Sequence, residues 1–432
     1  MQSKYSILRI FELVFTVLSL FHLSQALTPL LLTGGASEGD GVDITTLDLS
    51  FNAKISLLIY FISFVLLFLR WKKVVALFRI DKSIWLIWLL LLIVCLSTLW
   101  SVFPSDSFRY SIYAIGTTSF GLYLATRYTI KEQIVIFSWT FGLIVVLSIL
   151  FSVALPQYGT MGGVHEGAWR GIYTHKNIFG LALVPAAVIF YLRALSSQSI
   201  RWVFWLLLAS TVALLVLANS TGSLVNLVIM LALCLFYRLL RWRYELMISA
   251  ILAGIIAGIA ALLWLFDYGG LDLIFTALGK DPTLTGRTDI WRYTWDMIQL
   301  RPWQGYGLNA FWHGLQGPSA YVELALTVPV AYAHNGYLDM WLGIGLIGLI
   351  AFFVGLFTAA TKALAWLRKT NTVEGFWPLL FLTYILLSNV AEGSITTMNN
   401  HLWAMYTATF CSLLIARDNI YSPAVRNIKR WA

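Results

Sequence analysis

Residues 134–154 read IVIFSWTFGLIVVLSILFSVA, a run of 21 residues without a charged side chain. A helix needs about 20 largely apolar residues to cross the hydrocarbon core of a bilayer. Backbone polar groups find no hydrogen-bond partner in lipid, so such a run has to be helical. This stretch therefore predicts a transmembrane helix, and the rest of the chain repeats the pattern.

The composition of the whole chain agrees with a membrane protein. It is 59% hydrophobic and 11% charged, whereas soluble domains carry about 25% charged residues. Its 19 Trp and 20 Tyr suit the membrane–water interface. We predict an all-α polytopic integral membrane protein, one membrane domain over residues 1–432, with about twelve spans. These are 7–27, 51–69, 84–100, 110–126, 134–154, 177–195, 202–218, 223–240, 246–266, 336–360, 376–392 and 402–417.

The basic residues divide unequally between the predicted loops. Twenty-one of the 29 lie in one alternating set of loops, near residues 4–9, 70–82, 127–131, 193–201, 238–243, 362–369 and 417–430. Positively charged loops stay in the cytoplasm. This split predicts that both termini are cytoplasmic. It also attributes the net charge of +9 to topology and to contact with anionic membrane lipids, not to a nucleic-acid surface.

The first apolar run resembles a signal peptide, because Lys4 and Arg9 precede it. It also contains Glu12 and lacks a clear cleavage site, so we expect it to be retained as a span.

The other eight basic residues fall on the outer side of the predicted topology: Lys54, Arg109, Arg170, Lys176, Lys280, Arg287, Arg292 and Arg301. Four of them lie in residues 267–335, predicted as a long periplasmic loop between spans nine and ten. Within it, residues 288–300 have helical apolar spacing with Thr288 as a candidate N-cap, which predicts an amphipathic helix. External arginines suit an anionic ligand, because the planar fork binds phosphate bidentately. We favour this role for Arg170 and Arg287, and ordinary surface pairing for Arg292 and Arg301.

Residues 169–177, WRGIYTHKN, contribute four hydrogen-bonding side chains at the start of a span: Arg170, His175, Lys176 and Asn177. Free N–H groups at a helix start attract anions, which favours ligand binding. The same residues also suit an ordinary helix entry, with a capping side chain and a lysine that reaches toward the interface. The sequence supports both interpretations equally.

Residues 333–341, AHNGYLDMW, open the tenth span. His334 can accept a proton near neutral pH, although taken alone it is better interpreted as a helix cap. Asp339 lies one turn deeper and shares a face with Asn335, and an acid just inside a span is a candidate functional residue. Glu392, at the outer end of span eleven, either lines the same cavity or marks the interface. Gly305-x-Gly307 follows no strand, so we reject a dinucleotide loop, and the cysteines and histidines show no metal-ligand spacing.

In order along the chain, these motifs resemble the superfamily of O-antigen ligases and O-antigen or exopolysaccharide polymerases. The resemblance covers most of the chain and is strongest over residues 169–348. Its elements are Trp169-Arg170-Gly171 with His175-Lys176-Asn177, the STGS turn at 220–223, Thr285-Gly286-Arg287, Gly305-Tyr306-Gly307, and His334-Asn335 followed by Leu338, Gly343, Gly345 and Gly348.

The resemblance implies a GT-C-like, metal-independent glycosyltransferase without a cofactor, in the inner membrane of a bacterium. It would transfer a glycan from undecaprenyl diphosphate to an acceptor sugar at the periplasmic face. His334 would be the general base and Arg287 the ligand of the donor diphosphate. Related proteins often carry an arginine in the turn that here reads NSTGS at 219–223, so Arg170 or Lys176 would supply the second cation. His175, Asn177, Asn335, Asp339 and Glu392 are the further candidate substrate-binding residues.

Within this superfamily the motifs look most like exopolysaccharide polymerases of the succinoglycan type, which join lipid-linked repeat units and can act with a chain-length regulator. One alternative is a ligase that transfers the finished glycan to lipid A-core. An alternative of another class is a transporter or flippase, which would show charged or broken helices near the midplane and an internal repeat. The sequence shows acids mainly at span ends and no clear repeat.

Overall fold

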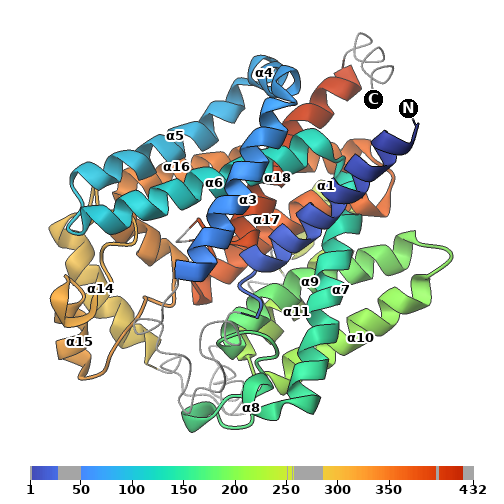
Figure 1. Cartoon of the computed structure of the whole chain (residues 1–432). Helices are drawn as coiled ribbons and strands as arrows, with labels where there is room; N and C mark the ends of the chain where they lie inside the picture. Colours follow the sequence, from blue (N-terminus) through green and yellow to red (C-terminus); the bar gives the residue numbers. More distant parts are fainter. Residues whose placement is uncertain are drawn as a thin grey trace.

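The computed structural model describes residues 2–27, 50–250, 252–254, 256, 286–395 and 398–421. Within these ranges every regular element is helical (Figure 1), and the extended pairing is a single isolated bridge between Thr160 and Trp169. The prediction of an all-α architecture is confirmed.

Eleven of the described helices follow predicted spans. They are α1 (Gln2–Leu23), α3 (Ser50–Phe68), α5 (Trp85–Leu96), α6 (Pro104–Arg127), α7 (Ile130–Ala154), α9 (Lys176–Ser196), α10 (Arg201–Leu217), α11 (Thr221–Leu239), α16 (Gly336–Lys369), α17 (Trp377–Ala391) and α18 (His401–Tyr421). Four shorter helices lie between the predicted spans: α4 (Trp71–Ile80), α8 (Pro156–Gly159), α14 (Arg287–Leu300) and α15 (Ala320–Leu326). The predicted span 246–266 lies largely outside the described residues.

Length and composition qualify seven of the described helices to cross a membrane: Phe51–Phe68, Lys82–Leu99, Ile130–Ala154, Lys176–Ser196, Thr221–Leu239, Gly336–Lys369 and Val373–Ala391. Helix α10 and the part of α18 over His401–Ile415 are apolar but shorter. The protein therefore has several membrane-spanning helices, and the total of twelve stays a prediction.

Helices α9 and α18 form the centre of the bundle. α9 packs against α7, α10 and α11, and α18 packs against α6, α16 and α17. Small residues allow this close approach. A Cβ on Gly180 would lie 2.1 Å from Ser223 Oγ of α11, and one on Gly121 of α6 would lie 2.6 Å from the carbonyl oxygen of Ala404. The core is thus made of tightly packed helices that expose apolar side chains outward.

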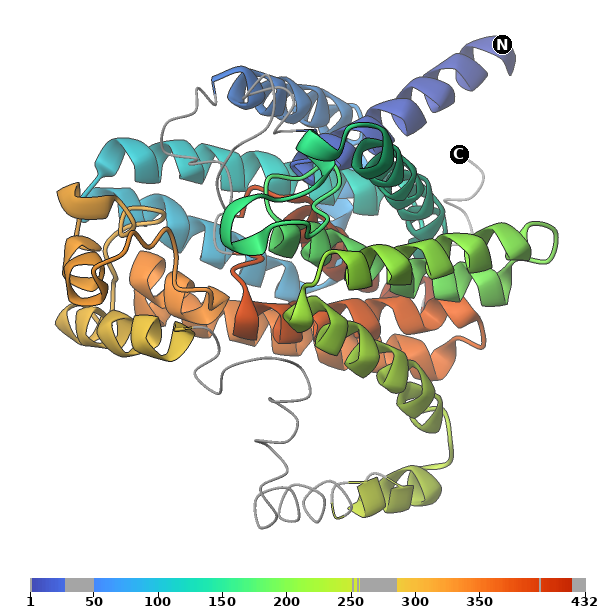
Figure 2. The same ribbon diagram turned by 90° about the horizontal axis from the view of Figure 1, so that it is seen from below.

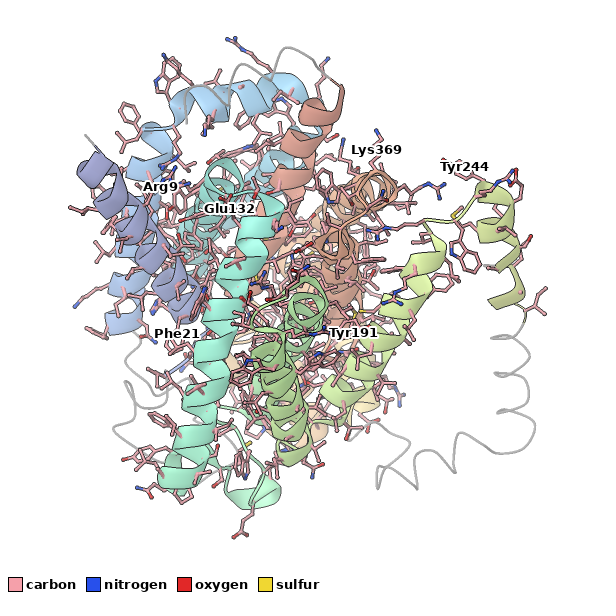
Figure 3. All side chains as sticks on the ribbon, turned by 90° about the vertical axis from the view of Figure 1, so that its right-hand side faces the viewer. Arg9, Phe21, Glu132, Tyr191, Tyr244 and Lys369 are labelled. Carbon is pink, nitrogen blue, oxygen red and sulfur yellow. The ribbon has the colours of Figure 1, made fainter. Side chains whose placement is uncertain are left out.

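The loops that carry most basic residues meet at one end of the bundle. The carboxylate of Glu12 on α1 pairs with Arg70 and Arg127, which follow α3 and end α6. In Figure 3 the labelled Arg9, Glu132, Lys369 and Tyr244 lie across the upper part of the view, above Phe21 and Tyr191. The meeting of these basic loops at one end of the bundle agrees with the alternation of basic loops in the sequence. The location of this end in the cytoplasm stays a prediction.

Helix α16 is interrupted at Gly345, which has φ 69° and ψ −179°. This backbone region is essentially restricted to glycine. The segment 302–307 fills the interruption: Tyr306 N donates to the carbonyl of Leu342 at 2.7 Å, and Gly307 N donates to that of Gly343 at 2.9 Å. A Cβ on Gly305 would lie 2.4 Å from the Leu342 oxygen. Gly305 and Gly307, rejected above as a dinucleotide motif, therefore allow the segment 302–307 to pack against the break in α16.

The amphipathic helix of the long loop is present as α14, but its start differs from the prediction. The helix begins at Arg287 and its N-cap is Gly286, with φ 80° and no side-chain cap, so Thr288 is not the cap. Glycine adopts this left-handed conformation without strain. α14 lies beside α15, next to the turn between α5 and α6 (Figures 1 and 2). Residues 267–285 of the predicted loop lie outside the described residues.

Candidate functional site

A single carboxylate, that of Glu392 at the end of α17, joins four separate segments. Its Oε1 accepts hydrogen bonds from Asn177 Nδ2 at 2.8 Å and from Arg287 Nη2 at 2.7 Å. Its Oε2 accepts from Tyr332 Oη at 3.3 Å and lies 3.6 Å from Nδ1 of His334. The structure thus brings the starts of α9, α14 and α16 to the end of α17.

The carboxylate of Glu392 is buried among positively charged and polar groups. Burial by itself would raise its pKa, but His334, Arg287 and His175 outweigh this effect and hold the pKa below the ordinary value. Glu392 is therefore ionised at neutral pH. The carboxylate of Glu392 therefore neutralises the guanidinium of Arg287, with which it forms an ion pair.

Asn389 fixes the turn that carries Glu392. Its side chain is fully buried, and its Oδ1 accepts from the backbone N–H groups of Ser394 and Ile395 at 3.0 and 3.3 Å. Gly336, the first residue of α16, lies directly against it, since a Cβ there would approach Oδ1 to 2.1 Å. Asn389 was not among the residues that the sequence motifs singled out, although a polar amide inside a predicted span is a signal of function.

Arg287 is the first residue of α14 and uses both prongs of its guanidinium on the end of α17. Nη1 donates to the carbonyl of Ala391 at 2.5 Å, and Nη2 donates to Glu392. About a fifth of the side chain, 21%, is still exposed. The planar fork is therefore held in a defined orientation with part of its donor surface open.

His334 has a left-handed backbone, with φ 51°. For a residue with a Cβ this conformation is strained, and such residues concentrate at functional sites. The helix cap is the next residue: Asn335 Oδ1 accepts from the N–H groups of Tyr337 and Leu338 at 3.0 and 3.2 Å. The interpretation of His334 as the cap is wrong, because its imidazole faces Glu392 instead.

Asp339 fixes the backbone just before His334. Its Oδ1 accepts from Ala333 N at 3.0 Å and from Trp312 Nε1 at 2.8 Å. The carbonyl of Ala333 accepts in turn from Trp291 Nε1 of α14 at 2.9 Å. Asp339 Oδ2 is buried without a hydrogen-bond partner among the described residues. One oxygen of Asp339 therefore supports the backbone of the site, and substrate binding by Asp339 stays a prediction.

The candidate residues of the segment before α9 lie in two places, with Arg170 inside the loop and His175, Lys176 and Asn177 at the start of the helix. Arg170 is 1% exposed, and its guanidinium donates to the carbonyls of Tyr158 and Thr174 at 3.0 and 3.3 Å. These contacts hold the loop 158–174 together and turn the guanidinium away from solvent. Binding of a diphosphate by Arg170 stays a prediction, and this geometry favours a structural role.

His175 and Lys176 lie at the start of α9, next to Asn177, which binds Glu392. His175 caps α9, with Nδ1 accepting from Asn177 N at 3.1 Å. Burial lowers the pKa of His175 to about 4, so its imidazole is neutral at neutral pH. Lys176 Nζ donates to the carbonyl of Asn219 at 3.3 Å. The ammonium therefore lies at the 219–223 turn, where the superfamily often carries an arginine.

Comparison with known proteins supports the motif-based resemblance. Residues 202–353 match the family described as O-Antigen ligase, and this stretch includes the 219–223 turn, Arg287 and His334. The chain is also 27% identical over 351 residues to the exopolysaccharide production protein ExoQ of Rhizobium meliloti, covering 76% of this chain and 77% of that protein. The resemblance is confirmed: the chain is a membrane protein that carries an O-antigen ligase family segment and is related to an exopolysaccharide production protein.

Proposed function

We propose that the protein is a glycosyltransferase that joins polysaccharide repeat units at the periplasmic face of the inner membrane. The donor is a glycan on undecaprenyl diphosphate, and the acceptor is a sugar of a second lipid-linked chain. The observation that carries the proposal is the meeting of Arg287, His334 and Asn177 on Glu392. These residues bring a cation, a proton acceptor and a carboxylate to one point. Such a site suits transfer of a glycan from an anionic leaving group to a hydroxyl.

Arg287 and Lys176 hold the donor diphosphate in this proposal. Negative charge develops on the diphosphate as its bond to the sugar breaks, and fixed cations stabilise that charge. Arg287 offers a planar fork, and Lys176 takes the place of the arginine absent from residues 219–223. Asn177 links the two places, because its Nδ2 binds Glu392 and its Oδ1 lies 3.2 Å from Ser220 Oγ.

His334 removes the proton from the acceptor hydroxyl. The hydroxyl oxygen attacks the anomeric carbon, the bond from that carbon to the diphosphate oxygen breaks, and the electron pair leaves with the diphosphate. Because Nδ1 faces Glu392, Nε2 is the nitrogen that receives the proton. The carboxylate of Glu392 then stabilises the imidazolium. One direct displacement of this kind inverts the anomeric configuration.

The name of the related protein concerns exopolysaccharide production, which favours a polymerase. The family description favours the ligase alternative, with lipid A-core as acceptor. A broken helix such as α16 is also a feature of transporters. Here residues 302–307 satisfy the freed backbone groups, so the break supports the loop fold and offers no argument for a transport path.

The proposal is tested with purified protein in lipid nanodiscs, a lipid-diphosphate repeat unit as donor and a chelator of divalent metals. We expect glycans longer than one repeat and released lipid diphosphate, and we expect both to disappear with His334→Ala. Products formed only when lipid A-core is added would identify a ligase. In closed liposomes that contain the protein, movement of the donor across the bilayer without new glycosidic bonds would refute the proposal.

The orientation needs its own measurement. A cysteine replacing exposed Gln316, between α14 and α15, should react with a membrane-impermeant thiol reagent in cells whose outer membrane alone is opened. A matched cysteine replacing exposed Lys369, at the end of α16, should react only after the inner membrane is opened. The reverse pattern would place the site in the cytoplasm and remove the lipid-linked donor from the argument.

A further inference from the structure

Tyr332 contacts both partners of the proposed proton-transfer pair. Its ring centroid lies 4.0 Å from that of the His334 imidazole, with 42° between the ring planes. Its hydroxyl lies 3.3 Å from Oε2 of Glu392, which is also the carboxylate oxygen nearest to His334 Nδ1. Tyr332 was not among the residues that the sequence motifs singled out.

The hydroxyl of Tyr332 acts as a fixed donor. Burial, reinforced by the charge of Glu392, raises the pKa of Tyr332 well above its ordinary value. The phenol therefore keeps its proton at any pH at which the protein works. It can orient the carboxylate by a hydrogen bond, but it cannot replace His334 as a base.

The backbone around His334 is fixed independently of Tyr332. Asp339 and Trp291 hold Ala333 on one side, and the Asn335 cap holds the other. These contacts fix the backbone of His334 and not its side-chain torsions. Tyr332 lies against the face of the imidazole, and Glu392 lies near its Nδ1.

We propose that Tyr332 is a positioning residue, which fixes the plane of the His334 imidazole with its ring and the facing Glu392 oxygen with its hydroxyl. This inference rests on the proposed function, in which Nε2 of His334 must point at the acceptor hydroxyl. A misplaced base lowers the rate of the chemical step, because transfer depends on near-attack geometry. Donor binding by Arg287 and Lys176 is unaffected.

Two variants separate the contributions of the ring and the hydroxyl. Tyr332→Phe keeps the ring and removes the hydrogen bond to Glu392, whereas Tyr332→Leu removes both. Tyr337→Phe is the matched control, because the Tyr337 hydroxyl donates to the carbonyl of Leu386 at 2.8 Å and its ring stacks on Phe353, away from the carboxylate.

Each variant is measured in two ways. The first is kcat and the donor KM for glycan transfer. The second is the rate at which diethyl pyrocarbonate modifies His334, followed at that residue by mass spectrometry. The second measurement reports the environment of the imidazole and requires no transfer activity, so it tests the positioning even if the reaction is of another kind.

For Tyr332→Leu we expect kcat to fall by about tenfold or more with KM within about twofold of wild type. The imidazole should be modified roughly threefold faster or more, since an aromatic face no longer covers it. For Tyr332→Phe we expect kcat to fall about three- to tenfold, with the modification rate unchanged. Tyr337→Phe should match wild type in both measurements.

An unchanged modification rate in Tyr332→Leu would overturn the positioning role. A faster rate with wild-type kcat would show that the ring covers His334 without serving catalysis, which also overturns the proposal. If wild-type protein transfers no glycan, the proposed function fails, and the modification rates alone then decide whether Tyr332 orients the imidazole.

Discussion

Gly345→Ala is expected to destabilise the protein strongly, because two independent features exclude a Cβ at this position. The backbone has φ 69° and ψ −179°. A Cβ would also lie 2.0 Å from the carbonyl oxygen of Trp303, whereas real Cβ atoms essentially never come within 3.0 Å of another atom. That carbonyl belongs to the segment 302–307, which is hydrogen-bonded into the break of α16 and cannot move alone.

The magnitude follows from these two features. Holding a residue with a side chain in this backbone region costs of order 1–3 kcal/mol. Forcing the packed segment apart by about 1 Å costs a further ~1–3 kcal/mol. The expected loss is therefore about 4 kcal/mol. With an unfolding entropy of about 2.1 cal/mol/K per residue over 432 residues, this corresponds to a decrease in Tm of roughly 4–5 °C.

The assay is thermal unfolding in detergent, followed by intrinsic tryptophan fluorescence. Gly343→Ala is the matched control, two residues away in the same helix, where the nearest atom to an added Cβ is the Gly307 oxygen at 3.7 Å. That variant should keep or slightly raise Tm, since alanine is favoured over glycine in helices by about 0.5–1 kcal/mol. Equal Tm values for the two variants would refute the packing argument.

The remaining predictions concern the candidate site. Arg287→Lys should lower transfer about 10- to 100-fold at normal expression, because lysine keeps the charge but loses one of two directed donors; near-normal polymer would exclude a bidentate role. His334→Ala should abolish transfer while circular dichroism stays unchanged, and turnover close to wild type would leave the mechanism without its base. The pKa of Glu392 is lowered in the folded state. Ionised Glu392 therefore stabilises the fold fully above the ordinary glutamate pKa of about 4.3, and this stabilisation is lost as the pH falls through the lowered pKa of the folded state. In a plot of Tm against pH, Glu392→Gln should lack the decrease in Tm that the wild type shows at acidic pH. If the two proteins give the same plot, Glu392 does not contribute to the acid dependence of stability.

The positions of the helices could be predicted from the sequence because the signal is local. A run such as residues 134–154 matches the lipid solvent by itself, and its backbone has no alternative to a helix. Arg287, His334 and Glu392 could also be selected as candidates from the sequence, since they lie at the predicted outer ends of spans, away from the loops that carry most basic residues. Their chemical roles came from the resemblance and stay predictions.

The contacts between these residues were decided by the tertiary structure alone. Arg287 and Glu392 are 105 positions apart, and Asn177 and Glu392 are 215 apart, so no local pattern relates them. The same holds for the burial of Arg170, for the break of α16 at Gly345 and for the ring of Tyr332 on His334. Each apolar run is stable as a helix in lipid by itself, so its sequence is enough to predict it. These contacts form only where the ends of several helices pack together, so they depend on the whole fold.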